Sequence, residues 1–348
     1  MAEPGTSGRC GDLFAAKNIK PMLIGAEGEP FDDDAFFYEL KIDGERCIAY
    51  LDPLEGTELR DKRNARMLPK IPELAELHRN VTRRCILDGE LAVLSDGKPD
   101  FFAIQRRDRL TNPLRIQQAA RRQPACFIAF DLLYLDNYSV TDLPLGKRKV
   151  LLQEAVRRED ALFALSPCVE RGGAAVFELV KRQNLEGLVA KRRESRYYFG
   201  RHTKDWIKMK VLRDEDFVVC GYIRRTSRVA GIVLGQYRGG QLVHKGQVSL
   251  ETGGEDFRRI RELLTDVPPP VPVSEGTEGA VGVAPSLVCT VRYMMKTESG
   301  GMRQPVFQGL RPDKAPGECL EGGRPGGQDL NLPDAQRPEP DSGKEQTE

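Results

Sequence analysis

One short segment of the sequence combines a lysine with two carboxylates in a pattern that suits covalent chemistry. Residues 36–46 read FFYELKIDGER, and their alternation predicts a strand with Glu39, Lys41 and Asp43 on one face. Lysine has an ordinary pKa of about 10.4, so its amine becomes a nucleophile at neutral pH only where nearby cations or burial lower that pKa. A solvated strand face has the same pattern, so this segment by itself does not assign a function.

Further motifs with charged residues follow at wide intervals. In chain order they are Arg63-Asn64, Leu87-Asp88-Gly89-Glu90, Phe130-Asp131, the segment from Glu186 to Lys191, the segment from Trp206 to Lys210, and the segment from Arg311 to Lys314. Lys208 and Lys210 share one face of a predicted strand. Cations and a carboxylate-bound Mg²⁺ stabilise the charge that develops on a phosphoryl group during its transfer. The series therefore favours phosphoryl-transfer chemistry.

This ordered series resembles the motifs of the covalent nucleotidyltransferases, which include DNA ligases, RNA ligases and mRNA capping enzymes. The resemblance covers about residues 19–314 and is strongest to bacterial ATP-dependent DNA ligases related to the ligase module of non-homologous end-joining enzymes. It implies sealing of nicks with 3′-hydroxyl and 5′-phosphate ends in double-stranded DNA, in DNA repair or end joining. The implied intermediates are a lysyl-AMP and then a DNA-adenylate, and the implied cofactors are ATP and Mg²⁺ or Mn²⁺.

The resemblance also implies roles around the nucleotide. Lys41 is expected to attack the α-phosphate of ATP, expel pyrophosphate and carry the AMP. Glu39 is expected to contact adenine, and Phe130 to stack on it. Glu90 matches a residue near the ribose and a metal ion, and Glu186 matches a second metal carboxylate. These five residues would form the adenylation pocket.

Phosphate contacts are implied for a second set of residues. Arg46 matches an arginine that holds the 5′-phosphate of the nick, and Lys208 and Lys210 match contacts to the α-phosphate. Arg63 matches an arginine on nucleotide or substrate phosphate, although the family usually has Ser-Arg-Asn-Gly where this chain has Lys-Arg-Asn-Ala at 62–65. That departure weakens the match of Arg63.

Three more matches lie further along the chain. Arg201 resembles a phosphate-binding arginine ahead of the lysine pair. Arg311 and Lys314 match residues that orient pyrophosphate in the first step, which requires their domain to close over the pocket by a hinge near residues 211–214.

The elements that must position these residues fall into three zones, and the predicted fold class is α+β. Residues 1–212 alternate strand-like and helical runs and are expected to form the nucleotidyltransferase (adenylation) domain. Predicted strands cover 36–50, 85–94, 127–135 and 185–191, and predicted helices cover 71–77, 150–158 and 174–183.

The other two zones differ in composition. Residues 213–314 contain short β-rich runs at 217–223, 231–237, 242–248 and 287–294, as expected of a small OB-fold barrel. A Pro- and Gly-rich stretch at 266–285 predicts a long loop inside that zone. Residues 315–348 carry eight acidic and three basic residues and predict a disordered acidic tail.

Composition narrows the class of protein. The chain of 348 residues has a net charge of +1, and the acidic tail leaves +6 on the rest, which suits a phosphate-rich partner. It lacks a run of about 18 apolar residues and a signal-like N-terminus, so we expect a cytoplasmic protein with no membrane contact. The eight cysteines form no CxxC and are expected to be reduced thiols.

Several alternatives remain open at this stage. The absent cysteine cluster and the forty residues before Lys41 favour ATP over NAD⁺ as donor. We also expect a monomer, with any end-joining proteins acting in trans because no polymerase or nuclease module is recognised in the sequence. The arginines at 105–109, with Arg115, Arg121 and Arg122, are either a DNA-backbone contact or a solvated helix. An RNA ligase with the same lysyl-AMP chemistry is the main rival, followed by a non-catalytic nucleic-acid-binding module.

Overall fold

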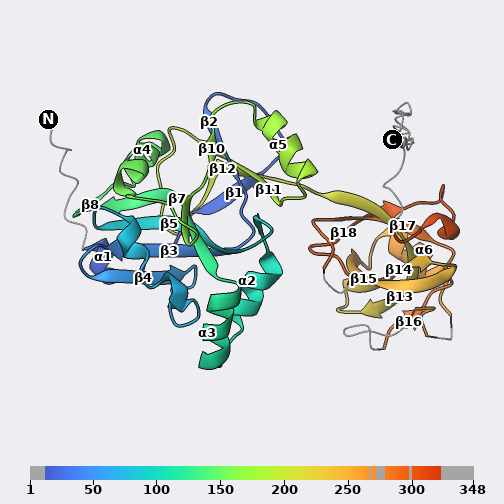
Figure 1. Cartoon of the computed structure of the whole chain (residues 1–348). Coiled ribbons are helices and arrows are strands. Elements are labelled where there is room, and N and C mark those ends of the chain that lie inside the picture. The colour runs from blue at the N-terminus through green and yellow to red at the C-terminus, as the bar shows by residue number, and fades with distance from the viewer. Residues whose placement is uncertain (1–11, 266–267, 272–278, 298–299, 323–348) are drawn as a thin grey trace, which may run out of the picture. The chain divides into compact units, whose positions relative to one another are not determined.

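Two compact units make up the chain. The computed structural model describes residues 12–265, 268–271, 279–297 and 300–322. Unit 1 ends at Val211 and unit 2 begins at Leu212 (Figure 1). The predicted division between 212 and 213 differs from this one by a single residue. Among the described residues, no helix has the length and apolar character needed to cross a membrane.

A five-stranded sheet in unit 1 carries the segment that leads to Lys41. Its strands, in spatial order, are β1 (Leu23–Glu27), β12 (His202–Lys210), β11 (Gly187–Arg192), β2 (Phe36–Leu40) and β10 (Cys168–Val169). Neighbours are antiparallel except β1 and β12. Helix α5 (Gly173–Arg182) covers one face, where Tyr38 of β2 shares a buried cluster with Phe177.

A seven-stranded sheet forms the second layer of unit 1. Its main path is β4 (Gly56–Asp61), β3 (Glu45–Asp52), β5 (Cys85–Ser95), β7 (Ala125–Leu135) and β8 (Tyr138–Ser139), with β6 (Lys98–Pro99) on β5 and β9 (Phe163–Leu165) on β7. The remaining helical elements of the unit are α1 (Leu13–Ala16), η1 (Pro72–Leu74), η2 (Leu77–Asn80), α2 (Phe101–Asp108), α3 (Pro113–Arg122) and α4 (Leu145–Ala155).

The two sheets share an apolar core. Trp206 and Val189 of the five-stranded sheet meet Ile48 and Ile86 of the seven-stranded sheet in one buried cluster. Because side chains alternate along a strand, Leu87 next to Ile86 points to the other face and joins a separate, larger cluster.

The chain crosses from one sheet to the other at the Lys41 motif. The predicted strand 36–50 is in fact two strands, β2 and β3, separated by a turn at residues 41–44. Gly44 is required in this turn, because a Cβ there would lie 2.2 Å from the carbonyl oxygen of Leu91. The predicted helix at 71–77 is also wrong. Its buried residues Ile71, Leu74 and Leu77 are spaced by three, which suits the 3₁₀ turns observed as η1 and η2.

The predicted basic run lies on α2 and α3. The side chain of Asp100 caps α2 by accepting from the Ala103 amide at 2.9 Å, and Asn112 caps α3. Arg107 is buried, with Nη1 2.7 Å from the Glu73 carboxylate, and so has a structural role. The other arginines of the run are exposed on α2, α3 and the turn between them, and α3 projects from the rest of unit 1 (Figure 1).

Unit 2 has the strand order of an OB-fold. The path is β15 (Gln241–Glu251), β14 (Val229–Arg238), β13 (Arg213–Arg224), β17 (Val288–Tyr293) and β18 (Val306–Leu310), all antiparallel, with α6 (Glu255–Glu262) between β15 and β17. This is a three-stranded meander followed by two strands that return to its first strand, a partly open five-stranded barrel. The two-residue strand β16 (Val281–Gly282) also pairs with β13.

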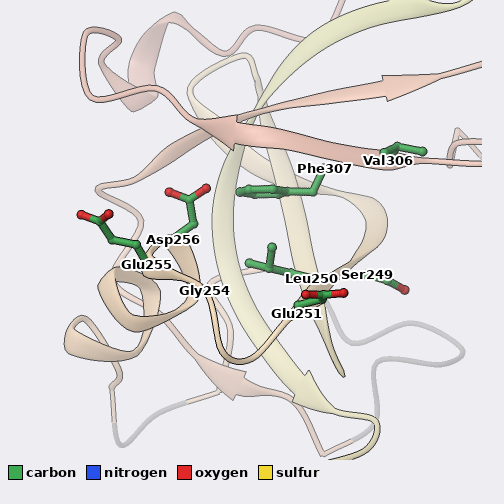
Figure 2. A pocket seen from close by; sticks show the side chains of 8 residues that line it. All are labelled: Ser249, Leu250, Glu251, Gly254, Glu255, Asp256, Val306 and Phe307. Carbon is green, nitrogen blue, oxygen red and sulfur yellow. The ribbon is translucent and has the colours of Figure 1, made fainter. Parts of the chain in front are cut away.

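A cleft of about 510 Å³ lies between β15, β18 and the start of α6. Figure 2 shows Leu250 and Phe307 between the two strands, with Glu255 and Asp256 beside them at the start of the helix. No β15–β18 hydrogen-bond ladder occurs within the described part of unit 2. The cleft is thus the place where the barrel remains open.

Two predicted irregular regions of unit 2 are partly ordered. Within the predicted loop 266–285, residues 281–282 form β16, while 266–267 and 272–278 lie outside the described residues. The tail prediction is wrong for residues 315–322, which include η3 (Pro316–Glu318). Here β14 extends beyond its pairing with β13, and Tyr237 pairs instead with the backbone of Cys319 and Glu321. Residues 323–348 lie outside the described residues.

Candidate active site

Strand pairing gathers three of the predicted motifs at one end of the interior strands β2, β11 and β12. The amide of Lys41 donates to the carbonyl of Gly187 at 2.9 Å, and Gly187 pairs with Lys210 across β11 and β12. Gly187 has a φ of +148°, and a Cβ there would lie 2.0 Å from the Met209 carbonyl oxygen. Only glycine allows this approach, which fixes Glu186, one residue earlier, beside the turn that carries Lys41.

The ammonium of Lys41 is held by Glu186. Lys41 Nζ lies 2.7 Å from Glu186 Oε1, and the side chains are 22% and 6% exposed. The alternation of residues 36–46 predicted Lys41 between Glu39 and Asp43 on one strand face, and this prediction is wrong for Glu39. β2 ends at Leu40, so Lys41 lies in the turn that follows the strand, and its ammonium pairs with Glu186 and not with Glu39.

Glu39 forms a separate buried cluster with two other lysines. Its carboxylate lies 2.6 Å from Lys149 Nζ of α4 and 2.9 Å from Lys191 Nζ of β11. Burial opposes the charge of Glu39, but the two lysines outweigh it and lower the pKa of this carboxyl. Burial also lowers the pKa of Lys191. The predicted adenine contact is therefore the centre of a charge cluster that fixes α4 to the sheet.

Phe130 lies beside this cluster and is almost fully buried, with 8% of its surface exposed. The Lys191 Nζ is 4.0 Å from the ring centroid, and the Arg46 guanidinium is 4.6 Å from it. Trp206 packs edge-on at 6.2 Å between ring centroids. The ring thus has two cation–π partners, and a base that stacks on it must share or replace one of them.

Arg46 is anchored by Asp88 of the neighbouring strand. Its guanidinium makes two hydrogen bonds to this carboxylate, both 2.6 Å long, and the Tyr197 hydroxyl donates to Asp88 at 2.6 Å. Burial opposes the charge on Arg46, but the fully buried Asp88 outweighs it and raises the pKa of the guanidinium. Arg46 is therefore held rigidly, with 16% of its side chain left accessible.

Glu90 has a strongly perturbed pKa in this site. Burial raises its pKa from the ordinary value of 4.5 to about 8, although the charges of Arg46 and Lys41 act in the opposite direction. The carboxylate of Glu186 raises it further, which places the two predicted metal carboxylates within electrostatic reach of each other. Among the described residues, no three His, Cys, Asp or Glu side chains are grouped to hold a metal ion.

The two lysines predicted to contact phosphate have a carboxylate partner that the sequence analysis missed. Glu27, at the end of β1, places Oε2 3.2 Å from Lys208 Nζ and 3.4 Å from Lys210 Nζ. Although burial acts in the opposite direction, hydrogen bonds and charges of these lysines lower the pKa of Glu27. The parallel pairing of β1 with β12 aligns Glu27 with Lys208, and no motif in the sequence marks this contact.

Two predicted residues of unit 1 lie away from this group, and two more belong to unit 2. Arg63 is exposed on the tight turn after β4. Arg201 precedes β12, at the opposite end of that strand from Lys208 and roughly 20 Å from it at the usual rise per residue. Arg311 and Lys314 belong to unit 2, where Asp216 lies 3.4 Å from Arg311 and 2.8 Å from Lys314.

The sequence marked other partners in the site only in part. Asp131, beside Phe130, makes hydrogen bonds of 2.7 and 2.8 Å to Arg148 of α4, and both side chains are fully buried. Lys191 and Asp88 stand inside the quoted motifs, so those motifs were a signal for them. Lys149 stands in none, and only the packing of α4 reveals it.

The fold and the strand-end lysines are those of a nucleotidyltransferase domain joined to an OB-fold domain. Residues 21–210 match the family model described as ATP dependent DNA ligase domain, and residues 225–314 match the ATP dependent DNA ligase C terminal region. The first match alone covers more than half of the 348 residues. The chain belongs to the ATP-dependent DNA ligase family.

Individual relatives agree with this assignment. The chain is 31% identical over 322 residues to the multifunctional non-homologous end joining DNA repair protein LigD of Mycobacterium tuberculosis, covering 88% of this chain and 40% of that protein. It is 27% identical over 295 residues to the SPbeta prophage-derived DNA ligase-like protein LigB of Bacillus subtilis, covering 84% and 99%. The chain thus spans about 40% of LigD but nearly all of LigB.

A solved structure confirms the fold. The mycobacterial DNA ligase D complexed with ATP and MES has a TM-score of 0.52 and 29% identity to this chain, covering 87% of this chain and 98% of that one. These findings confirm the predicted α+β class and the resemblance to ATP-dependent DNA ligases, and they favour DNA ligase over the RNA ligase alternative.

Proposed function

We propose that this protein seals nicks in double-stranded DNA through an AMP group carried on Lys41. The observation that supports this most directly is the backbone pairing of Lys41 with Gly187 and of Gly187 with Lys210, which puts the backbone of Lys41 beside the end of β12 that carries Lys208 and Lys210. A triphosphate needs such cations, and the attack needs an amine beside them. Belonging to the ATP-dependent DNA ligase family supports ATP as the donor.

In the first step, Lys41 Nζ forms a bond to the α-phosphorus of ATP and the bond to pyrophosphate breaks. The amine must first lose a proton, and Glu186 Oε1, at 2.7 Å, is placed to accept it. Lys208 and Lys210 neutralise charge on the α-phosphate as the new bond forms. Glu27 must release these lysines for that contact.

The next two steps transfer the AMP and join the strand. An oxygen of the 5′-phosphate at the nick attacks the phosphorus of the lysyl-AMP, the phosphorus–nitrogen bond breaks, and Lys41 regains its amine. The 3′-hydroxyl then attacks the 5′-phosphorus of the DNA-adenylate, loses its proton, and AMP leaves. Arg46 and Arg63 are proposed to hold DNA or nucleotide phosphates during these steps.

The site offers two carboxylates as ligands for a magnesium ion. Mg²⁺ takes oxygen ligands and usually binds through one or two carboxylates, water and substrate phosphates, so Glu90 and Glu186 form a sufficient protein set. A bound Mg²⁺ supplies charge neutralisation on the phosphates. Glu90 must be ionised to serve as a ligand, and its raised pKa makes this depend on pH.

We also propose a setting for the reaction. LigD of M. tuberculosis is named a non-homologous end joining protein, and this chain spans 40% of it. By this likeness the protein contributes the sealing step of end joining or repair, as a monomer that works with end-joining proteins in trans. Arg311 and Lys314 are proposed to orient pyrophosphate in the first step.

A single pulse–chase experiment tests the function. The protein is incubated with Mg²⁺ and with ATP or NAD⁺ labelled in the AMP moiety, and then chased with nicked DNA or nicked RNA. We expect a protein–AMP adduct from ATP that is discharged by nicked DNA. An adduct formed only from NAD⁺, or discharged only by nicked RNA, would contradict the proposal.

A further inference from the structure

The segment between β11 and β12 exposes two aromatic side chains. Tyr198 is 45% exposed and Phe199 is 37% exposed, whereas the neighbouring Tyr197 is buried. We call Tyr198 and Phe199 the aromatic tip. Phe199 packs edge-on against Tyr197 with 5.7 Å between the ring centroids, but the exposed parts of both rings gain no stabilisation from burial, so packing within unit 1 accounts for only part of the aromatic tip.

The backbone of the aromatic tip is firmly held. The Arg201 amide donates to the Tyr198 carbonyl at 3.3 Å, and Gly200 has a φ of +67°, so the chain makes a tight turn that requires glycine. The Gly200 amide donates to the Lys20 carbonyl at 2.9 Å, and the Tyr198 amide contacts the Met22 sulfur at 3.3 Å. The backbone that carries the two rings is therefore ordered before any ligand arrives, which reduces the entropy lost on binding.

Positive charge surrounds the aromatic tip. Residues 192–204 contain five Lys or Arg residues and one acidic residue. Arg196, Arg201 and Lys204 are exposed, as is Lys20 beside Gly200. Within the described part of the chain, these four side chains have no hydrogen-bond or ion-pair partner. They are available to a polyanion.

Exposed aromatic rings among unpaired cations suit single-stranded nucleic acid. Each base offers a flat face that stacks on an aromatic ring, and each phosphate contacts a cation. A base inside a duplex is already stacked on its neighbours and hidden from such a ring, whereas an unpaired base is accessible. Charge and ring chemistry together therefore select unpaired nucleotides over intact duplex.

We propose that the aromatic tip binds unpaired nucleotides of the DNA substrate, with Arg196, Arg201 and Lys204 on their phosphates. The identity of the substrate as DNA rests on the proposed function. Arg201 lies roughly 20 Å along β12 from Lys208, so a strand at the transfer site reaches the tip after about six nucleotides. The tip is thus a second contact, which favours substrates with frayed or overhanging ends.

The test compares two labelled probes by fluorescence anisotropy, a 12-nucleotide single strand and a blunt 12-base-pair duplex. The variant combines Tyr198→Ala with Phe199→Ala. We expect its affinity for the single strand to fall about fivefold or more, since one stacked base contributes at least that much, and its affinity for the duplex to change less than twofold. The aromatic exchange Tyr198→Phe with Phe199→Tyr should keep the affinity for the single strand.

The matched control is Tyr138→Ala, which removes an aromatic residue that is 65% exposed elsewhere on unit 1. It should leave binding of both probes unchanged, and thermal unfolding of each variant verifies its fold. Unchanged single-strand affinity in the double variant, an equal loss for both probes, or an equal effect of Tyr138→Ala would overturn the proposal. These outcomes are separate from the function itself, because wild-type protein that forms no AMP adduct would refute the ligase reaction without bearing on the tip.

Discussion

The carboxylate of Glu27 lies 3.2 Å from the ammonium nitrogen of Lys208, one of the two lysines proposed to bind the α-phosphate of ATP. A carboxylate and a phosphate compete for the same cation. The lysine pair is therefore engaged internally until a nucleotide arrives, and the nucleotide must displace Glu27 to bind.

Replacement of Glu27 by glutamine is expected to strengthen ATP binding. The variant keeps the size of the side chain and removes its charge, so ATP no longer displaces an ion pair. Partly exposed ion pairs contribute about 0.2–1 kcal/mol, which predicts a KM for ATP about 1.4-fold to fivefold lower in the self-adenylation reaction. Glu29→Gln, on an exposed residue of the same segment, is the control. A raised KM in Glu27→Gln would show that Glu27 positions the lysines instead.

Glu90 is expected to make the stability of the protein depend on pH. Its pKa is raised by burial to about 8 in the folded protein, against an ordinary value of 4.5, so between these values the folded state holds a proton that the unfolded state has lost. The contribution of this carboxyl to the free energy of unfolding is thus fully present below pH 4.5 and is lost as pH rises to about 8. Glu90→Gln cannot ionise and escapes this loss.

The measurement is the Tm of wild type and Glu90→Gln at several pH values, without nucleotide or metal. The advantage of the variant should grow from pH 5 to pH 8 and then stay constant, while self-adenylation by the variant should be strongly reduced. An advantage that does not change with pH would mean that Glu90 is ionised in the folded protein at neutral pH.

The ordered end of unit 2 predicts a sharp boundary for truncation. Removal of residues 323–348 should leave Tm unchanged. Removal of residues 315–348 also deletes Cys319, which is 2% exposed, and the ion pairs of Glu321 with Arg238 and Lys245. Loss of this buried side chain costs about 1–2 kcal/mol, which predicts a Tm of unit 2 lower by about 5–10 °C. Calorimetry measures the Tm of both truncated proteins. Equal Tm values would contradict the claim that residues 315–322 belong to the folded part of unit 2.

Arg311 offers a test of the roles assigned to unit 2. If it orients pyrophosphate, Arg311→Ala should slow self-adenylation by about a hundredfold, the usual effect of removing one charge-stabilising donor. Sealing of pre-adenylated nicked DNA uses no pyrophosphate and should change little. The exposed Arg259 provides the control Arg259→Ala. Equal losses in both reactions would exclude the pyrophosphate role.

The strands that carry the motifs were largely predictable from sequence, because runs of apolar residues mark them directly. β5 and β7 follow the runs predicted at 85–94 and 127–135 closely. The break between β2 and β3 was not predictable in this way, since the alternation continues through residues 41–44. The requirement for Gly44 arises from Leu91, which is distant in sequence and adjacent only after β3 and β5 pair.

The partners of the site residues were harder to predict than the residues themselves. Lys41 was expected beside Glu39, its neighbour on an extended strand, but its ion pair is with Glu186, which the sheet brings close. Likewise, Glu39 pairs with Lys149, which depends on how α4 packs. Local periodicity contains no information on such contacts between distant segments. The ordered residues after 314 were missed because a single buried residue, Cys319, outweighs their disorder-like composition.

The proposed reaction depends most on Lys41 as the carrier of AMP, and mapping the adduct by peptide mass spectrometry tests this role directly. The protein is incubated with ATP and Mg²⁺, digested and searched for a lysine that has gained AMP. We predict the modification on Lys41 alone, its absence in Lys41→Ala, and full modification of the control Lys147→Ala, which alters an exposed lysine of α4. AMP on another lysine, or an undiminished adduct in Lys41→Ala, would contradict the account.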